Sequence, residues 1–455
     1  MKPVTYMKKI YTLLPGLLLT GLLLWGTTVK AQEPLVLSQA DCRAMALEHN
    51  ETLQKAENDL RKAELDKYVA FSSYLPSIDA TGMGIYLLND IEMTKVEEMG
   101  MGMAMQMKGT YLAGINLIQP IYAGGKIIAG NKLARIGVES ADENVRKTRM
   151  EVIADADNAY WTYIATRRKI GMLESYCEQM EALYRQVEVS LSAQLATKND
   201  LLRITAKRSE INYQLQKARN GVNLCRLALC NVLGVDFTTE IIPTDTLFET
   251  GAAPVLDGDI SQRPELRLLQ KQIDAQEQQI KVTRADMLPT VGLGLGYSYL
   301  GNIKMKMASV NTTDGSVTQL SSEFKQGFPL GMLSVSIPIL HWGANFKKVK
   351  KSKYDLLNAR LDFQEKSRLL TIEAQQALQN VSESYMLIGT AELGLEQAEE
   401  NLRTMEECYR NQMATLTDLL DAQAQWQQAE SNYIEAQTQY KIYETEYLRT
   451  TGRLE

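Results

Sequence analysis

The chain has 455 residues, 45% of them hydrophobic, and its 49 Lys and Arg against 55 Asp and Glu give a formal net charge of −6 at pH 7. This slightly acidic balance is not typical of a nucleic-acid-binding protein, and we expect no nucleic-acid partner. The cysteines are odd in number and contain no C-x-x-C pair, which indicates buried thiols rather than a disulfide framework. They are Cys42, Cys177, Cys225, Cys230 and Cys408.

Residues 1–31 have the features of a secretory signal peptide, with a retained membrane anchor as the alternative. Lys8 and Lys9 precede an apolar run that ends at Trp25, and Val29–Ala31 forms a small-residue cleavage site. No cysteine stands at that site, so we expect no lipid attachment there. After this segment no window reaches the roughly 18–20 apolar residues of a transmembrane helix. Any membrane insertion must therefore use another kind of structure.

Helical and then strand-like patterns open the mature chain. Residues 38–75 are rich in Ala, Glu, Lys and Leu and stop before Pro76, which predicts a helix with Ser38 as its N-cap. Segments rich in Gly, Ile and Tyr predict strands at 77–88 and 110–121. Methionines alternate in the connection between these strands, at positions 99, 101, 103, 105 and 107. Thioethers suit a soft ion such as Cu(I), but an extended hairpin gives the same pattern, and we expect no metal site.

A coiled-coil hairpin is predicted next, because apolar residues recur at steps of three and four without a proline. Its parts are a long helix at 126–191, a turn at 192–199 and a return helix at 200–233. Gly234 then provides a helix-terminating residue. We expect the linker 235–262, which contains Pro243 and Pro254, to lie partway along this shaft as an equatorial belt of irregular structure.

The second half of the chain repeats the first. Asp200 recurs as Asp418 at a spacing of 218 positions (418 − 200), and many other residues recur at the same spacing, so the chain is a tandem duplication. We divide it into a first repeat at 32–234 and a second at 263–455. The second repeat is predicted to contain a helix at 264–288, strands at 290–300 and 331–341, a long helix at 344–410, a turn at 411–417 and a return helix at 418–450.

The strands of the second repeat alternate large apolar residues with small or polar ones. Val291, Leu293 and Leu295 alternate with glycines, and Leu333 and Val335 alternate with serines. This pattern is typical of a membrane barrel wall with lipid on one side and water on the other. Aromatic residues stand where interfacial girdles are expected: Tyr86, Tyr122, Tyr299 and Trp342. Because four strands cannot close a barrel and lipid does not tolerate open edges, the chain must oligomerise.

This arrangement resembles the outer-membrane efflux protein family, the TolC-like channels, over residues 35–452. The resemblance is carried by the duplicated order of helix, strand, strand and helix, by the Leu-Pro and Pro-Ile junctions, and by the tip motif Y-x8-D-L-L-D-A at 409–422. It implies a mainly α protein with membrane β structure. Three chains would form a β-barrel of 12 strands, four from each chain, continuous with a long α-helical coiled-coil barrel that carries a small mixed belt.

The same resemblance implies a location and partners. The homotrimer would lie in outer-membrane lipid with a long periplasmic extension, and it would engage a periplasmic adaptor (membrane fusion) protein and an inner-membrane RND or ABC pump. In this family, aspartates near the periplasmic tip ring the entrance, and their positions match Asp418 and Asp421. A tyrosine and an aspartate that hold the tip closed match Tyr409 and Asp200, whereas the arginine of that latch is Ala414 here.

The residues themselves support a pore ring at the tip. Asp418 and Asp421 are three positions apart and so share a helix face. Threefold symmetry would place about six carboxylates around one constriction, where they would attract cations and repel anions. The alternative is that Asp418 is only a first-turn acid, which the dipole of its own helix stabilises, and that Asp200 is first of all a capping residue.

No arrangement of residues indicates catalysis. His49 and His341 stand without a nucleophile or zinc spacing, and the glycines at 292–296 have the wrong spacing for a dinucleotide loop. We therefore expect no enzyme activity, no cofactor and no metal. The predicted function is the passive exit duct of a tripartite efflux pump or type I secretion system, gated at the helical tip. The alternative is a periplasmic coiled-coil scaffold or adhesin without a channel. The cargo and the pump partner stay open.

Overall fold

The computed structural model describes residues 34–89, 91–94, 101–245, 256–310 and 316–454. The predicted signal peptide at 1–31 and Met99 lie outside these residues, and so do the side chains of Met101 and Met103. All five cysteines are free thiols; Cys42 and Cys230 are buried and the other three are half-buried.

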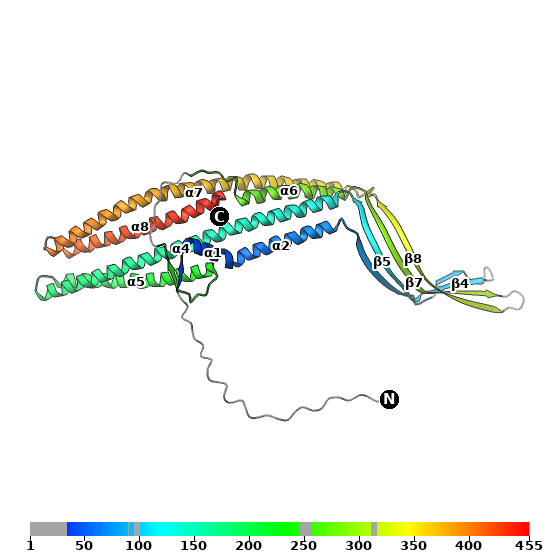
Figure 1. Cartoon of the computed structure of the whole chain (residues 1–455), viewed down its shortest axis with the longest axis horizontal. Helices are drawn as coiled ribbons and strands as arrows, with labels where there is room; N and C mark the ends of the chain where they lie inside the picture. Colours follow the sequence, from blue (N-terminus) through cyan, green and yellow to red (C-terminus); the bar gives the residue numbers. More distant parts are fainter. Residues whose placement is uncertain (1–33, 90, 95–100, 246–255, 311–315, 455) are drawn as a thin grey trace, which may run out of the picture.

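The chain is an elongated molecule with helices along most of its length and strands at one end (Figure 1). The first half contains β1 (Leu35–Leu37), α1 (Gln39–His49), α2 (Glu51–Ser72), β2 (Ser77–Tyr86), β3 (Ile91–Thr94), β4 (Met101–Gln106), β5 (Lys108–Ala123), α4 (Lys126–Ser192), α5 (Lys198–Leu233) and β6 (Ile241–Pro243). The second half contains α6 (Pro264–Ala285), β7 (Thr290–Val310), β8 (Val317–Ser336), α7 (Ala344–Arg410) and α8 (Leu416–Thr451).

The two halves have matching helices. α4 and α7 each have 67 residues, and α5 and α8 each have 36. Both long helices begin after a glycine in the left-handed conformation, Gly125 and Gly343, and both return helices end at one, Gly234 and Gly452. Glycine is favoured there because it adopts positive φ without a Cβ penalty. The repeat seen in the sequence is therefore also a repeat of the backbone.

The prediction of one helix at 38–75 was wrong, because α1 and α2 are separate helices. Asn50 leaves the helical conformation with φ −69° and ψ 119°. Its side-chain Oδ1 accepts hydrogen bonds from the backbone N–H groups of Thr52 (2.8 Å) and Leu53 (3.1 Å), so it caps α2. Asparagine is among the most favoured N-cap residues, and the break lets α1 turn away from the line of α2.

The predicted strands of the second half also need correction. The strand expected at 290–300 continues to Val310 as β7, and the strand expected at 331–341 is β8, which runs from Val317 only to Ser336. Residues 337–341 lie outside the strand, because Pro338 has no N–H to donate to a ladder. β3 and β4 were not predicted; they extend the sheet beyond the first strand pair.

Two sets of helices pack side by side along the shaft. Near the sheet, α2 packs on α4, α4 on α6, and α6 on α7. Toward the other end, α4 packs on α5 and α8, and α8 packs on α7 (Figure 1). In the set near the sheet, α2 and α7 each pack against only one described neighbour of that set. Apolar side chains stay exposed on both of them: Leu65, Tyr68, Val69 and Phe71 on α2, and Phe346, Tyr354, Leu357 and Leu361 on α7.

The belt, formed by α1, β1 and β6 against α4 and α5, contains a large cluster of buried apolar residues. β1 pairs with β6 in parallel, from Leu35 opposite Ile241 to Leu37 opposite Pro243. The Tyr163 hydroxyl donates to the Ile241 carbonyl at 2.9 Å and anchors this pair to α4. The predicted linker 235–262 thus contributes β6 to ordered structure.

A buried ion pair fixes α1 and α8 to α4 beside the belt. Asp157 of α4 is 1% exposed. Its carboxylate accepts from Arg43 Nε at 2.8 Å, from Arg43 Nη2 at 2.5 Å and from the Thr445 hydroxyl at 2.6 Å. Every oxygen of this buried charge is therefore hydrogen-bonded, as burial requires.

The four long strands form one antiparallel sheet in the order β2, β5, β7, β8. Beyond the pairing with β5, β7 pairs with β4, which in turn pairs with β3. β2 and β8 each have one edge without a partner among the described strands. The sheet is therefore open on both sides within one chain.

Candidate functional site

The helical tips, where α4 turns into α5 and α7 turns into α8, have the same local geometry. Each turn contains a glutamine with positive φ, Gln194 at 63° and Gln412 at 60°. Each return helix then begins at a threonine N-cap with an aspartate three residues later, Thr197 with Asp200 and Thr415 with Asp418. The tip turn is thus duplicated with the helices.

Asp200 and Asp418 act as capping residues. The Asp418 carboxylate accepts from the Thr415 backbone N–H at 2.9 Å and from the Thr415 hydroxyl at 2.7 Å, while the Thr415 hydroxyl accepts from the Asp418 N–H at 3.2 Å. Asp200 makes the same contacts with Thr197. These hydrogen bonds lower the pKa of both carboxyl groups below the usual range of aspartate. The T-x-x-D spacing was visible in the sequence as a capping box, although the helices were expected to begin two residues later.

We expect acid to loosen the first turn of α8. Because the folded pKa of Asp418 is lowered, its capping contribution is present above the unfolded pKa of about 3.9 and is lost as the pH falls through the folded pKa. Hydrogen exchange of the amides of 416–419, corrected for the intrinsic rate, should be measured at neutral pH and at a pH below the folded pKa of Asp418. Protection should be reduced at the lower of these two pH values. A Thr415→Val variant should be poorly protected at both pH values. Equal protection of the wild type at both would contradict the capping role.

Asp421 differs from Asp418. It is exposed on α8 and makes no hydrogen bond or ion pair with any described residue. Asp418 is exposed as well, although its carboxylate is engaged by Thr415. The two carboxylates lie about one turn apart on α8, at the end of the shaft, and therefore share one face of this helix.

Tyr409 and Asp200 come from different hairpins and lie close together. Tyr409 is half-buried against the apolar core of the tips. Burial raises the pKa of the Tyr409 hydroxyl, and the nearby negative charge of Asp200 adds to this rise. No hydrogen bond joins the two side chains within the described residues. The tips touch through this apolar core and through Arg203 of α5, whose guanidinium donates to the Thr417 hydroxyl of α8. Sequence reasoning missed this pair, because Arg203 lies outside the tip motif and Thr417 occupies one of its unspecified positions.

The seam between the two hairpins combines apolar and polar contacts. Near the tips one buried cluster contains residues of both hairpins, with Met180 and Ile204 from the first and Leu416 and Leu419 from the second. Farther along, Gln427 of α8 donates to Gln214 of α5 at 3.0 Å, and Arg168 of α4 donates to Gln437 of α8 at 2.7 Å. Since water can replace hydrogen bonds but not apolar contacts, moving the hairpins apart exposes apolar surface mainly at the tips.

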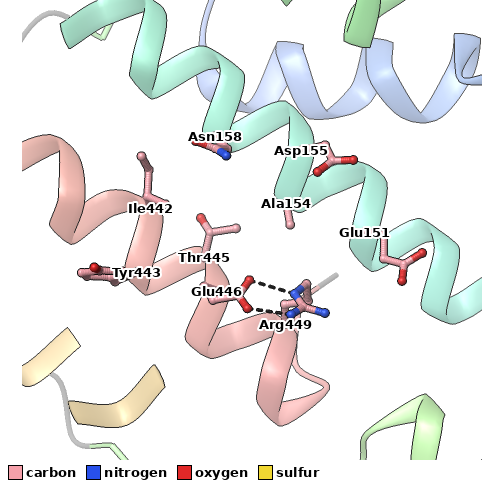
Figure 2. Close-up of a pocket in the computed structure, with 9 residues that line it drawn as sticks. All are labelled: Glu151, Ala154, Asp155, Asn158, Ile442, Tyr443, Thr445, Glu446 and Arg449. Atoms are coloured by element: carbon pink, nitrogen blue, oxygen red, sulfur yellow. Dashed lines mark hydrogen bonds and ion pairs between the residues drawn. The ribbon is translucent and has the colours of Figure 1, made fainter. Parts of the chain in front are cut away.

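A cavity of about 490 Å³ lies between α4 and α8 (Figure 2). Arg449 pairs there with Glu446 at 2.6 Å and, outside the cavity, with Glu373 of α7 at 2.9 Å. Asp155 is exposed, but desolvation at the cavity wall raises its pKa, and the adjacent Glu151 carboxylate raises it further. The lining has acidic, amide, hydroxyl and aromatic groups but no paired nucleophile and base, so the arrangement does not support catalysis.

The two faces of the sheet differ in chemistry. Residues directly opposite on neighbouring strands share a face, so Ile115 and Tyr297 lie on one side together with Leu117 and Leu295. On this apolar face the rings of Tyr111 and Tyr299 stack at 6.0 Å. The other face is richer in small and polar residues, and there Asn116 Nδ2 donates to the Thr81 hydroxyl at 3.3 Å. The expected girdle residues are exposed: Tyr86 68%, Tyr122 47%, Tyr299 38% and Trp342 90%.

None of the helices within the described residues is both long and apolar enough to cross a membrane. Among the same described residues, no group of three or more His, Cys, Asp or Glu side chains could hold a metal ion.

The shaft of paired long helices with an open four-stranded sheet defines the TolC-like class of outer-membrane channels. The structure is similar to the CmeC outer membrane channel of Campylobacter jejuni, with a TM-score of 0.72 and 17% identity over 91% of this chain and 85% of that chain. It is similar to the outer membrane protein VceC of Vibrio cholerae (0.73, 14%, 91% and 96%) and to the open state of the MtrE outer membrane channel of Neisseria gonorrhoeae (0.73, 16%, 91% and 88%). Comparison with curated protein sequences gives no match.

The family model "Outer membrane efflux protein" matches residues 43–235 and 256–453, and the chain belongs to this family. The resemblance noted in the sequence is thereby confirmed. The protein is an outer-membrane channel of an efflux system with a periplasmic extension, and its family and structural neighbours are channels rather than enzymes.

Proposed function

We propose that the chain forms, as a homotrimer, the exit duct of a tripartite efflux pump or type I secretion system, with its gate at the helical tips. Transport through it is passive, from the periplasm to the exterior. A periplasmic adaptor and an inner-membrane RND or ABC pump supply the cargo and the energy. The observation that carries this proposal is that each side of the chain has an unpaired strand edge and, in line with it, a helix with exposed apolar side chains.

The unpaired strand and the uncovered helix lie on the same side of the chain in both cases. β2 and α2 form one side of the molecule, and β8 and α7 form the other. An apolar sheet cannot keep open edges in lipid, and the exposed apolar side chains of α2 and α7 require a partner. A cyclic arrangement of copies pairs β8 with the neighbour's β2 and α7 with its α2, and three copies give 12 strands around an aqueous bore. This arrangement leaves the belt on the outside, because α1, β1 and β6 would otherwise fill the bore.

The tip carboxylates supply a charge-selective entrance. Asp418 and Asp421 are exposed at the end of the shaft, and a threefold ring of them favours cations. Opening separates the hairpins at the tips, where the Arg203–Thr417 contact breaks and Tyr409, next to Asp200, leaves the apolar core that the two hairpins share. The MtrE structure is described as an open state, which supports a fold with more than one arrangement of its entrance.

Neutralising the tip carboxylates is expected to reduce cation preference. The variant should combine Asp418→Asn with Asp421→Asn, because an amide oxygen at 418 keeps a capping acceptor while it removes the charge. The measurement is single-channel current in planar bilayers with a salt gradient across them. Asp41→Asn is the matched control, since it makes the same change in the Ser38 capping box of α1, which lies in the belt and not at the tips. Unchanged reversal potential in the double variant would remove these residues from the pore, and a wild-type oligomer that conducts no ions would contradict the duct itself.

A further inference from the structure

α7 begins with a lysine cluster directly after the sheet. Five of the residues 344–353 are lysines: Lys347, Lys348, Lys350, Lys351 and Lys353. All five are exposed, and none makes an ion pair with any residue that the structure describes. Lys350 lies 5.8 Å from the ring centre of Tyr354, and the next acid along the helix is Asp355. The patch is therefore strongly positive in a chain whose net charge is −6.

The first repeat shows that the fold does not require these charges. At the same spacing of 218 positions (347 − 129), the counterparts of the cluster in α4 are Ala129, Gly130, Lys132, Leu133 and Arg135. α4 nevertheless reaches the same length of 67 residues as α7. Of its two cations, Arg135 pairs with Glu139 at 3.1 Å. The lysine cluster is thus an addition to the second repeat with a role other than helix formation.

An exposed apolar segment precedes the cluster. After β8 ends at Ser336, Ile337 is 61% exposed, Ile339 91% and Trp342 90%. Tryptophan and aliphatic side chains of this kind mark the boundary between membrane and water. At a rise of 1.5 Å per residue, the lysines lie within about 15 Å of the start of α7, a distance comparable to the Debye length of about 8–10 Å.

We propose that the lysine cluster binds the anionic headgroups of phospholipids in the periplasmic leaflet of the outer membrane. Four to eight basic residues immediately beside a membrane-embedded segment are the pattern by which anionic lipids are recognised. Val349 and Ser352 are the buried positions of this part of α7, where the Ser352 hydroxyl lies 3.3 Å from that of Thr283 on α6. Lys350 lies on the same side of the helix as Phe346 and Leu357, which the trimer places against α2 of the neighbour. Lys347, Lys348 and Lys351 lie on a face that neither α6 nor this contact covers, and the proposal assigns that face to lipid headgroups. This inference depends on the outer-membrane location and not on the gate or the pump.

The test uses the full-length protein purified in detergent, with phosphatidylglycerol as the anionic probe and phosphatidylcholine as the neutral one. Native mass spectrometry counts the lipid molecules retained. Replacing all five lysines by glutamine, which has a similar helix propensity, should weaken phosphatidylglycerol retention roughly 10-fold or more and leave phosphatidylcholine retention unchanged. Replacing all five by arginine should keep the wild-type lipid preference. Inorganic phosphate should not compete, because it lacks the acyl chains that hold a lipid against the exposed Ile337, Ile339 and Trp342.

Three other outcomes would overturn the proposal, each in a recognisable way. Equal phosphatidylglycerol retention by the glutamine variant would show that the lysines do not bind lipid. An oligomer that falls apart with both lipids would place them between subunits. A changed reversal potential in planar bilayers, with unchanged lipid retention, would place them in the bore. Failure of the wild type to conduct would contradict the duct but would leave the lipid counts interpretable.

Discussion

Replacing Asp157 with alanine is expected to lower the free energy of unfolding by about 3–5 kcal/mol. The variant leaves Arg43 without its bidentate partner and the Thr445 hydroxyl without its acceptor. Because the Arg43 side chain is 28% exposed, water can solvate it in part, and we expect a loss near the lower end of this range. The measurement is the loss of helical circular dichroism of the detergent-solubilised protein in a denaturant titration.

Asp155 provides the control for this prediction. It is an aspartate of the same helix, two residues before Asp157, but it is exposed and makes no ion pair with a described residue. Asp155→Ala should change the free energy of unfolding by less than about 0.5 kcal/mol. Similar losses for both variants would mean that removal of any acid from this part of α4 is destabilising, and that the buried ion pair has no special role.

Gly452→Ala is expected to have the second largest effect, a loss of about 2–4 kcal/mol that combines left-handed strain with overpacking. Gly452 has φ +76°, and a Cβ there would lie 2.7 Å from the Gln262 carbonyl carbon and 2.8 Å from Arg263 Cα. These are backbone atoms of the segment that leads into α6, so they cannot move aside cheaply. The end of α8 would have to shift away from this segment. Thermal unfolding of the variant and the wild type in the same detergent measures the difference.

Gly343→Ala separates strain from contact. Gly343 has nearly the same φ, +77°, but a Cβ there would meet nothing within 4 Å. It should therefore cost only the left-handed strain, about 1–2 kcal/mol. If Gly343→Ala proved as damaging as Gly452→Ala, the close approach to Gln262 and Arg263 would not be the cause.

The long helices and the repeat could be predicted from the sequence because their signals are periodic. Apolar steps of three and four residues extend over dozens of positions in α4 and α7, and no proline interrupts them. The mainly α fold with membrane β structure, the family and the outer-membrane location are confirmed. The extent of β7 and β8 could not be predicted, because the Lys, Met and Ser residues beyond Leu300 have weak strand propensity, and cross-strand pairing with β4 and β8 stabilises them instead.

Less of the candidate site than of the fold could be predicted from the sequence. The positions of Asp418, Asp421, Asp200 and Tyr409 came from the resemblance, and their roles in the gate stay predictions. The capping boxes were readable from Thr197 and Thr415, since their spacing to the aspartates is local. The Arg203–Thr417 contact joins residues 214 positions apart, and only tertiary packing brings them together. The expectation from sequence took the chain to have no basic clusters and so overlooked the lysine cluster, whose meaning depends on its place next to the sheet.

The pairing of β1 with β6 has a consequence for the order in which the protein forms. Leu35 lies opposite Ile241, so β1 can pair with β6 only after the whole of α4 and α5 has been synthesised. The last part of the second repeat behaves alike: Leu454 is buried against Met150 and Ile153 of α4, so that part of α4 stays uncovered until residue 454 has been synthesised. A chain still being made therefore exposes apolar surface at the belt throughout. Holdase chaperones of the periplasm would bind this apolar surface. Truncated chains, which cannot complete the belt, would expose it for longest.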